Sequence, residues 1–365
     1  MATGTKPTRT KPTGMKPTLD EIRPVAWDAT EQALVLIDQT RLPGCVATVS
    51  CRTTDEVIDA IARLVVRGAP ALGAVGGYGV AVAMLQSGRE DWSSQLLDAQ
   101  IERIRQARPT AVNLAWGVDR VRRMMPQGLD SVLAEAARIM EEDEVANRAL
   151  SELGADWIRE RIGGTAPLRV LTHCNAGALA TTAWGTALGI VRELHARRQL
   201  EHVIADETRP LLQGSRLTAW ELQREGIEVL VQADAAAAST IMRGLVDVAI
   251  IGADRIARNG DTANKIGSLG VALACQEARV PFVVAAPSST VDLATASGDD
   301  IRIELREGTE VTTFAGIPTA PEGVAGLNPA FDVTPWRYIS AIVTEAGIVA
   351  PDGQPIDRLV GRSAK

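Results

Sequence analysis

In the second half of the chain, short apolar runs alternate with longer segments whose apolar residues have helical spacing. The runs lie at 169–172, 203–205, 229–231, 246–251 and 282–286, and the helical segments at 176–195, 215–225, 235–243 and 265–278. Strands separated by helices of this length predict βαβ units and a doubly wound parallel sheet. A final helix is expected to begin at Thr334 and Pro335 and to end at Gly347. Sheets of this kind bind ligands outside the carboxyl ends of their strands, so residues directly after each run are the first candidates for a site.

The part of the chain before this alternation has a mainly helical pattern. Thr53 and Glu56 form a capping-box signature at the start of an apolar helical stripe. Gly68 is expected to end that helix, and Pro70 suits the first turn of the next one. The other expected elements are short strands at 25–27 and 33–38 and helices at 92–107, 110–124 and 130–160.

The segment 163–167 reads Gly-Gly-Thr-Ala-Pro and interrupts the helical pattern, which predicts a domain boundary. We therefore expect an α/β protein with a mainly helical domain and a small β element at 20–162, followed by a Rossmann-like domain at 163–365. The first residues repeat Lys-Pro-Thr, a composition with almost nothing to bury, so residues 1–19 are expected to form a disordered tail.

Composition excludes several classes of partner and cofactor. The net charge of −7 argues against a nucleic-acid or anionic-membrane surface. No apolar stretch of 18 residues and no secretory signal is evident, which favours a cytoplasmic protein. The four cysteines form no CxxC pair and are expected to be reduced. The three histidines are not at metal-ligand spacing, so no metal site is expected.

Two residues that follow apolar runs could carry chemistry. Cys174 follows the first run and is expected at the start of a helix, where the helix dipole lowers the pKa of a thiol; the alternative is a small buried cysteine that only packs. Asp254 follows the fourth run and either points into the crevice or caps a turn. Lys265 lies shortly after it and could neutralise the carboxylate or hold a substrate oxygen.

Two arginines share a context that suits phosphate. Arg67 and Arg108 each stand just before a helix start marked by proline. Free backbone N–H groups at a helix start, together with a guanidinium group, form a phosphate site. The first turn after the run at 169–172 lacks the glycine fingerprint of a dinucleotide site, so a nicotinamide enzyme is disfavoured. The residues predict a phosphorylated substrate held between the domains, near a thiol and a carboxylate, with no cofactor.

Seven motifs together resemble one family, the methylthioribose-1-phosphate isomerases. They lie at 36–43, 66–73, 108–116, 172–181, 206–222, 251–265 and 328–335. The resemblance extends from about residue 20 to residue 350 and covers both expected domains in order. Each motif alone is weak, but seven in the same order are highly specific.

The resemblance implies roles for individual residues. It implies that Cys174 and Asp254 are the catalytic pair. The residues implied to hold the phosphate are Arg67, Gly68, Ala69 and Arg108. Those implied to bind sugar hydroxyls or the phosphate are Gln213, Asn264 and Lys265. It further implies a cytoplasmic homodimer that converts 5-methylthioribose 1-phosphate to 5-methylthioribulose 1-phosphate in methionine salvage, without a cofactor.

Two related classes are alternatives within the same superfamily. Ribose-1,5-bisphosphate isomerases share the cysteine–aspartate pair, and the pocket around the distal end of the sugar would distinguish them: apolar for a methylthio group, cationic for a second phosphate. Regulatory subunits of the initiation factor 2B complex are disfavoured because the motifs that carry Cys174, Asp254 and both arginines are intact. The sequence leaves open whether Cys174 is a base at C2 or lines the path of a hydride shift.

Overall fold

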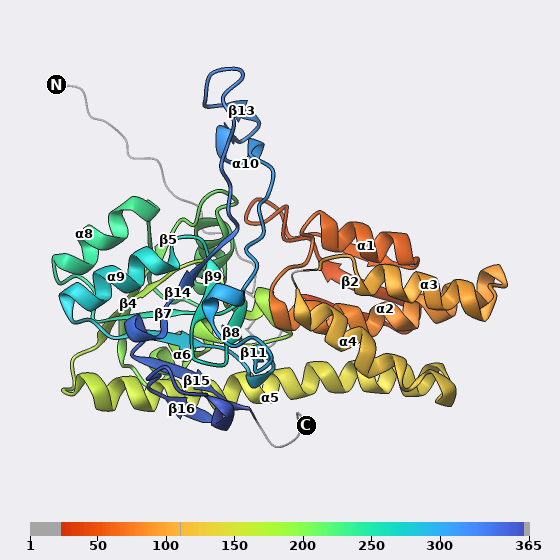
Figure 1. Cartoon of the computed structure of the whole chain (residues 1–365), viewed down its shortest axis with the longest axis horizontal. Helices are drawn as coiled ribbons and strands as arrows, with labels where there is room; N and C mark the ends of the chain where they lie inside the picture. The colour runs from red at the N-terminus through yellow and green to blue at the C-terminus, as the bar shows by residue number, and fades with distance from the viewer. Residues whose placement is uncertain (1–22, 110, 361–365) are drawn as a thin grey trace, which may run out of the picture.

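The computed structural model describes residues 23–109 and 111–360. Figure 1 shows a helical lobe formed by the N-terminal third of the chain and a larger lobe built around a parallel sheet, with one long helix, α5 (Leu129–Ile162), running along both. The expected α/β fold class is therefore confirmed. The Lys-Pro-Thr tail lies outside the described residues.

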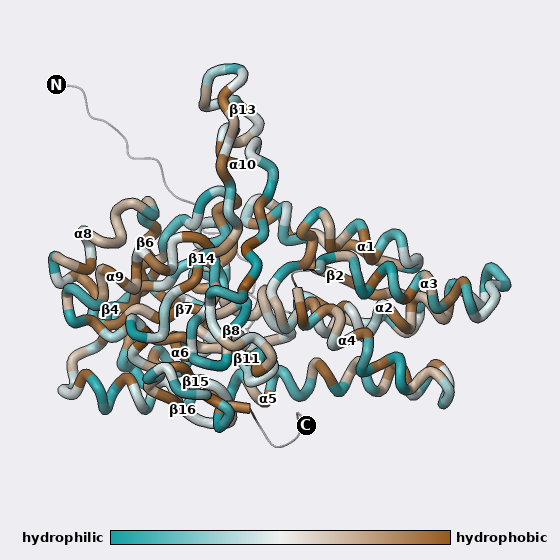
Figure 2. Tube along the Cα trace, in the orientation of Figure 1, coloured by the Kyte–Doolittle hydropathy of each residue, from teal (hydrophilic) through white to brown (hydrophobic). Residues whose placement is uncertain are grey.

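The helical lobe contains a small antiparallel sheet, in the order β1-β2-β3, packed against helices. Its elements are β1 (Val25–Asp28), β2 (Ala33–Ile37), β3 (Thr48–Cys51), α1 (Thr54–Ala62), α2 (Ala69–Glu90), α3 (Ser94–Arg105) and α4 (Val112–Arg122). Figure 2 shows apolar and polar residues alternating along α3 and α5, as expected for helices with one face toward a core.

Helix α1 begins as the capping box predicts. The Thr53 side chain accepts from the Glu56 amide at 3.2 Å, and the Glu56 carboxylate accepts from the Thr53 amide at 2.9 Å. The expected stop at Gly68 is wrong, because the chain leaves the helix at Leu64, which has a left-handed φ of 61°. Gly68 instead precedes α2 as its N-cap, with a φ of 98°.

Helix α2 is the central helix of this lobe. It is long and apolar enough to cross a membrane by composition, which contradicts the expectation that no such apolar stretch exists, but 78% of its most apolar window is buried inside the protein. Gly73 and Gly117 let α2 and α4 approach closely, because a Cβ at Gly117 would overlap the Gly73 carbonyl. Such burial is typical of a core helix.

The larger lobe contains a seven-stranded sheet in the order β16-β15-β10-β7-β4-β5-β6. All neighbours are parallel except the edge strand β16. The strands are β4 (Leu168–Thr172), β5 (Leu200–Asp206), β6 (Val229–Gln232), β7 (Val248–Ile251), β10 (Phe282–Ala285), β15 (Ala341–Thr344) and β16 (Gly347–Val349). From β4 the chain adds β5 and β6 on one side and β7, β10 and β15 on the other. The doubly wound prediction is confirmed, and its switch point lies between β4 and β7.

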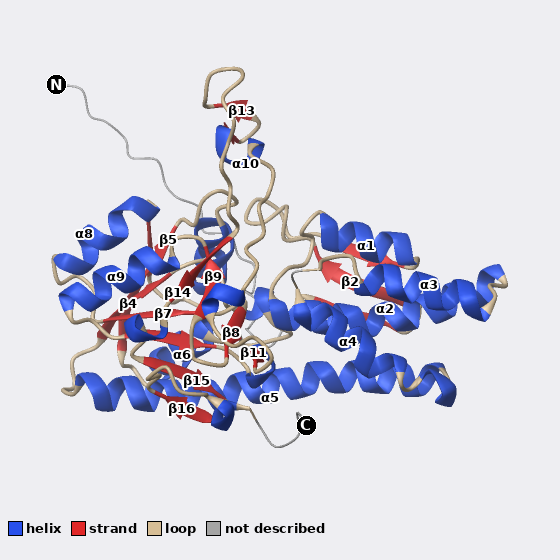
Figure 3. Ribbon diagram, viewed as in Figure 1, coloured by secondary structure: helices blue, strands red, loops and turns tan. Residues whose placement is uncertain are grey.

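Helices cover both faces of this sheet (Figure 3). Helix α6 (Ala187–Ala196) and the second half of α5 pack on one face, and α8 (Ala237–Met242) and α9 (Ser268–Ala278) pack on the other. The short helix α7 (Ala219–Arg224) adds Leu222 to the first of these cores. Helix α5 also contributes to the core of the helical lobe. The boundary expected at 162–163 thus falls at the end of a helix that belongs to both cores, and the division into two domains stays a prediction.

A second sheet and a projecting arm complete the larger lobe. The sheet has the order β11-β8-β9-β14, formed by β11 (Val291–Asp292), β8 (Arg255–Ala257), β9 (Thr262–Lys265) and β14 (Phe331–Thr334). The arm contains α10 (Thr309–Thr312), β12 (Thr313–Phe314) and β13 (Ile317–Pro318) and projects from the top of the molecule in Figure 1.

Two expected helices are wrong. The segment from Thr334 to Gly347 contains the end of β14, all of β15 and the start of β16, because the four apolar or small residues of β15 are buried beside β10. Lys265 ends β9 instead of starting a helix, and α9 begins only after Gly267, whose φ is 109°.

Candidate active site

All nine residues proposed from the sequence line one cleft between the lobes. Its empty volume is about 740 Å³, part of which is open to solvent. The nine are Arg67, Gly68, Ala69, Arg108, Cys174, Gln213, Asp254, Asn264 and Lys265. The structure thus brings together side chains from both lobes that are far apart in the sequence.

The cleft lies at the switch point of the large sheet. Cys174 comes two residues after β4, and Asp254 comes three residues after β7. These strands are hydrogen-bonded neighbours, with Val170 opposite Val248. Adjacent parallel strands end at the same edge, so both side chains lie in the crevice typical of doubly wound folds.

Cys174 has an unusual backbone conformation, and the pKa of its thiol is shifted in the direction opposite to that expected from the sequence. Its φ is 67°, a left-handed value that is strained for a residue other than glycine. Its amide donates to the Thr208 hydroxyl at 2.8 Å, and its carbonyl accepts from the Thr218 hydroxyl at 2.7 Å. Burial raises the pKa of the thiol, although Arg67 and Lys265 act in the opposite direction. The prediction of a helix start that lowers this pKa is wrong, because the next regular α-helix, α6, begins only at Ala187.

Asp254 has a pKa that is also raised. The residue is solvent-accessible in the cleft, although protein atoms surround the carboxyl group. Desolvation by these atoms raises its pKa, and nearby Lys265, Arg108 and Arg67 oppose the rise. A raised pKa increases the protonated fraction of a carboxyl group, and the protonated form can donate a proton.

Lys265 is buried beside this acid. Its ammonium group donates to the Ala330 carbonyl at 2.9 Å and lies 4.3 Å from the centre of the Phe331 ring. Burial lowers the pKa of the lysine, while Cys174 and Asp254 act to raise it. The preceding Asn264 donates to the Ser268 hydroxyl at 2.9 Å. Lysine and carboxyl group therefore influence each other's protonation across the cleft.

The opposite wall of the cleft suits an anion. Gly68 and Ala69 lie at the N-terminus of α2, where the helix dipole favours negative charge. Arg67 extends from the same turn, and Arg108 lies 3.8 Å from the Glu304 carboxylate. The Nε of Arg67 and the Oε1 of Gln213 are buried and make no hydrogen bond within the described residues, so both polar atoms are left without a protein partner in the wall of the cleft.

Two further residues of the cleft were missed from the sequence. Asn175 accepts from the guanidinium group of Arg67 through its carbonyl oxygen at 3.0 Å and also through its side-chain oxygen. The sequence could have identified Asn175, because it directly follows Cys174 and so also lies just beyond the end of a strand of the parallel sheet. Arg306 also lines the cleft, but it lies in an irregular segment whose sequence has no periodicity that would place it there.

An apolar compartment adjoins the cleft beyond Asp254. Its empty volume is about 540 Å³, and it shares Arg108 and Asp254 with the cleft. Its apolar lining consists of Leu72, Ala111, Ala263, Ile301, Ile303 and Phe331, and the arginines Arg108, Arg255 and Arg302 also line it. No motif in the sequence predicted this compartment.

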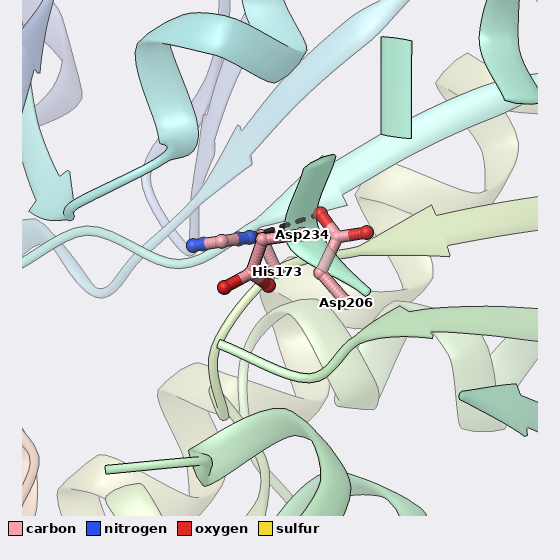
Figure 4. Close-up of side chains that lie close together, drawn as sticks. All are labelled: His173, Asp206 and Asp234. Carbon is pink, nitrogen blue, oxygen red and sulfur yellow. Dashed lines mark hydrogen bonds and ion pairs between the residues drawn. The ribbon is translucent and has the colours of Figure 1, made fainter. Parts of the chain in front are cut away.

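One group of described residues has the composition of a metal site. The ligand atoms of His173, Asp206 and Asp234 lie within 4.8 Å of one another (Figure 4). Each polar side-chain atom of the group already has a protein partner, including backbone amides of Thr208 and Arg209 for the two oxygens of Asp234. The side chains of His173, Asp206 and Asp234 therefore form a complete hydrogen-bond network with their neighbours. The expectation that the protein has no metal site remains a prediction.

Comparison with known proteins identifies the family to which the chain belongs. The model of the initiation factor 2 subunit family matches residues 65–351. A methylthioribose-1-phosphate isomerase of Xanthomonas campestris is 48% identical over 91% of this chain and 94% of its own length. A probable bifunctional methylthioribose-1-phosphate isomerase/methylthioribulose-1-phosphate dehydratase of Nocardia farcinica is 51% identical over 89% of this chain, which spans only 58% of that protein.

Solved structures show the same fold. The 5-methylthioribose 1-phosphate isomerase of Pyrococcus horikoshii has a TM-score of 0.78 at 39% identity, covering 90% of this chain and 92% of its own. A structure described as translation initiation factor eIF-2B, subunit delta, from A. fulgidus has a TM-score of 0.79, also at 39% identity, covering 93% and 99%. The names of these two proteins imply different functions for closely similar folds, so the site residues must decide between them.

Proposed function

Because this chain belongs to the initiation factor 2 subunit family and, within it, to the methylthioribose-1-phosphate isomerases, we propose that it converts 5-methylthioribose 1-phosphate to 5-methylthioribulose 1-phosphate in methionine salvage. The observation that carries this proposal is the combination found in one cleft: a thiol and a carboxyl group with raised pKa values, a cationic wall, and an apolar compartment.

The substrate needs a proton donor at the start. Its anomeric oxygen carries the phosphate, so the furanose ring cannot open spontaneously to an aldehyde. The protonated carboxyl group of Asp254 donates to the ring oxygen as the bond from that oxygen to C1 breaks. This step leaves a hydroxyl at C4 and a phosphorylated oxocarbenium ion at C1. The pKa of Asp254 is raised, a direction that favours the protonated form that this step needs.

Hydrogen then moves from C2 to C1. The oxocarbenium carbon accepts hydride from C2, and the C2 hydroxyl becomes a ketone by returning its proton to the Asp254 carboxylate. The acid is regenerated, and both the donor and the acceptor of the hydride are substrate carbons, so no redox cofactor takes part. Cys174 lines the path as a neutral thiol, which its raised pKa favours. A thiol of raised pKa is poorly suited to act as a base at C2 through its thiolate.

The cationic wall would hold the phosphate. Arg67, Arg108 and the amides at the start of α2 face the same region of the cleft as Cys174. Charge-assisted hydrogen bonds from guanidinium groups suit phosphate oxygens. Gln213, Asn264 and Lys265 remain for the sugar hydroxyls or the phosphate, and a phosphate in this place puts C1 and C2 near both Cys174 and Asp254.

The compartment has features that suit either group. Ala263 and Ile301 are buried and Phe331 is half-buried, which suits a methylthio group, whereas Arg255 and Arg302 in the same lining would suit a second phosphate. The methylthio sugar is proposed on the similarity to methylthioribose-1-phosphate isomerases, so a coupled assay should show turnover of methylthioribose 1-phosphate at least about a hundredfold above ribose 1,5-bisphosphate in kcat/KM. The reverse preference would assign the chain to the bisphosphate isomerases. Binding without turnover of either sugar would favour the regulatory class.

The assembly implied by the family resemblance is a homodimer. Light scattering of the purified full chain tests that proposal. A monomer at micromolar concentration would contradict it without bearing on the chemistry of the cleft.

A further inference from the structure

The side chain of His173 connects the ends of three strands next to the cleft. It follows β4 and is only 1% exposed. Its Nδ1 lies 2.9 Å from the Oδ2 of Asp206, the last residue of β5, as Figure 4 shows. Its Nε2 lies 2.8 Å from the carbonyl oxygen of Ile266, the residue after β9. The ring therefore bridges segments that are far apart in the sequence.

Both ring nitrogens face oxygen atoms that accept hydrogen bonds. A neutral imidazole carries one N–H and one acceptor nitrogen, so it could satisfy only one of these contacts. The other oxygen of Asp206 accepts from the Gln232 amide at 2.8 Å. The ring and this carboxylate must therefore hold two protons between them, which corresponds to an imidazolium paired with a carboxylate. Burial opposes a charged ring, but the hydrogen bond and charge of Asp206 outweigh it, and the pKa of His173 is raised.

The bridged segments carry the groups that face the substrate. Cys174 is the next residue after His173, and Lys265 immediately precedes Ile266. The turn after Ile266 packs directly on the ring, because a Cβ on Gly267 would lie 2.7 Å from its Cε1. The ring is thus held on both sides by parts of the cleft wall.

Cys174 needs such support because its left-handed backbone conformation is strained. A hydrogen-bond network beside the His173 ring supplies part of this support. Asp234 accepts from the Thr208 amide at 2.7 Å, and the Thr208 hydroxyl in turn accepts from the amide of Cys174 at 2.8 Å. The His173 ring is the one member of this network that also reaches the segment carrying Lys265.

We propose that His173 is a positioning residue, an imidazolium clamp paired with Asp206 that fixes the Cys174 turn against the Lys265 turn. The positioning role rests on the proposed isomerase function, whereas the two-proton state of the ring does not. His173 does not line the cleft, so it acts through its neighbours and not on the substrate.

The groups around the ring all favour its charged form. Asp206 faces it from β5 and Asp234 from the segment after β6. Asp332 on β14 accepts from the amide of Gly267 at 2.7 Å; burial raises its pKa, and backbone hydrogen bonds and the charge of His173 oppose that rise. The buried thiol of Cys275 on α9 lies within the influence of Asp206 and has a pKa raised to about 12, mainly by its own burial, so it adds no charge near neutral pH.

The direct test is ¹⁵N NMR of the full chain with labelled histidine. The chain has three histidines, and single His195→Gln and His202→Gln variants assign the signals. Both ring nitrogens of His173 should stay protonated at pH 7, above the ordinary titration of histidine near 6.5. A ring nitrogen that is unprotonated at pH 7 would overturn the clamp, whatever substrate the protein uses. His202, which is 15% exposed beside Glu201, is the internal comparison.

Kinetics of two variants test the positioning role. His173→Phe keeps a ring but removes both bonds, and kcat should fall about a hundredfold while KM changes less than about threefold, since misplaced reacting groups affect turnover more than binding. Asp206→Asn lets a neutral ring keep both bridges, so kcat should fall only about tenfold, and the spectrum should show one protonated ring nitrogen. His202→Gln should match the wild type.

The outcomes separate the two proposals. Wild-type kcat in a folded His173→Phe variant would overturn the positioning role, and wild-type kcat in Asp206→Asn would overturn its dependence on the charged pair. If His173→Phe does not fold, Asp206→Asn and the wild-type spectrum still decide. An inactive wild-type protein with two protonated ring nitrogens would contradict the isomerase proposal and leave the clamp standing as a structural feature.

Discussion

Arg67 and Asn175 join the two lobes across the cleft. The guanidinium group of Arg67, at the start of α2, donates to the backbone carbonyl of Asn175 at 3.0 Å and to its side-chain oxygen. Asn175 is held in turn by Glu221, whose carboxylate accepts from its amide at 2.9 Å. Because Asn175 directly follows Cys174, the arginine proposed to bind phosphate and the turn that carries the thiol have fixed relative positions.

This relationship predicts graded effects on substrate binding. Arg67→Ala should raise KM roughly tenfold to a hundredfold, since a charge-assisted contact contributes about 1.5–3 kcal/mol. Arg108→Ala should act in the same way. Asn175→Ala leaves the guanidinium group in place but less fixed, so its KM should rise only about fivefold. Arg63→Ala, which removes an exposed arginine paired with Asp59, is the control. Steady-state kinetics with unchanged KM in Arg67→Ala would exclude the phosphate role.

The proposed catalytic pair predicts loss of turnover without loss of stability. Cys174→Ser and Asp254→Asn should each lower kcat at least about a hundredfold, the scale of general acid–base catalysis. Both replacements are close in size, so melting temperatures should stay near that of the wild type. Cys45→Ser, at an exposed cysteine, is the matched control. Near-normal turnover in either variant would remove that residue from the mechanism.

The positions of Cys174 and Asp254 could be predicted from the sequence, but the direction of the pKa shift of Cys174 could not. Any doubly wound sheet brings the residues after neighbouring strands to one edge, so apolar runs ending before Cys174 and Asp254 were sufficient to place them. The pKa of Cys174 depends on what the chain does next. A left-handed turn replaces the expected helix start, and burial then determines the direction of the shift.

Other errors have the same origin in long-range contacts. The segment after Thr334 has apolar residues that suit either helix or strand, and only the exposed edge of β10 makes Ala341–Thr344 a strand. Arg306 reaches the cleft from the base of the projecting arm, where the bridge between Leu305 and Pro329 brings the chain back. The spacing of residues near Arg306 in the sequence does not predict that the chain comes back to the cleft at this point.

The raised pKa of Asp254 predicts a limit to activity at alkaline pH. The step that opens the ring needs the protonated acid, so kcat should fall as pH rises through the pKa of Asp254 in the substrate complex. Lys265 lowers this pKa. Lys265→Met should therefore move the alkaline limb of the profile to higher pH, in addition to any loss of affinity. A pH–rate profile whose limb moves to lower pH would contradict Asp254 as the acid.

Asp143 predicts a pH dependence of stability that is independent of activity. This carboxyl group on α5 accepts from the amide and the hydroxyl of Thr182, both at 2.8 Å, and burial raises its pKa to about 6. Its folded pKa lies above the unfolded value near 4, so stability should fall as pH rises from about 4 to about 6 and then stay level. Asp143→Asn can keep both bonds without the charge. It should be more stable than the wild type at pH 7.5, by about 1–3 kcal/mol, and equal to it at pH 4.

Urea denaturation at the two pH values measures this difference. Arg63→Gln, which breaks the exposed ion pair with Asp59 on α1, serves as a comparison whose effect should be small at both pH values. Equal stability of wild type and Asp143→Asn at pH 7.5 would show that the buried carboxyl group is not destabilising when ionised.

The path of the hydrogen from C2 to C1 is the sharpest chemical prediction of the site. A proton route through an enediol needs a base at C2, whose captured proton exchanges with water whenever the site is open. A hydride route keeps the hydrogen within the substrate. The thiol of Cys174 is only 8% exposed and its raised pKa makes the thiolate scarce, whereas Asp254 is already engaged with the oxygen protons.

We therefore expect no deuterium at C1 of the product when the reaction runs in deuterated water, as measured by NMR. Substantial deuterium at C1 would establish proton transfer and make Cys174 the base. A base fully shielded from water could also give an undeuterated product, and substrate deuterated at C2 separates the two cases in the Cys174→Ser variant. If the thiol only lines the path, the residual turnover of that variant should still carry the C2 deuterium to C1 with a primary isotope effect. If the thiol is a shielded base, the variant should lose transfer of the label along with its turnover.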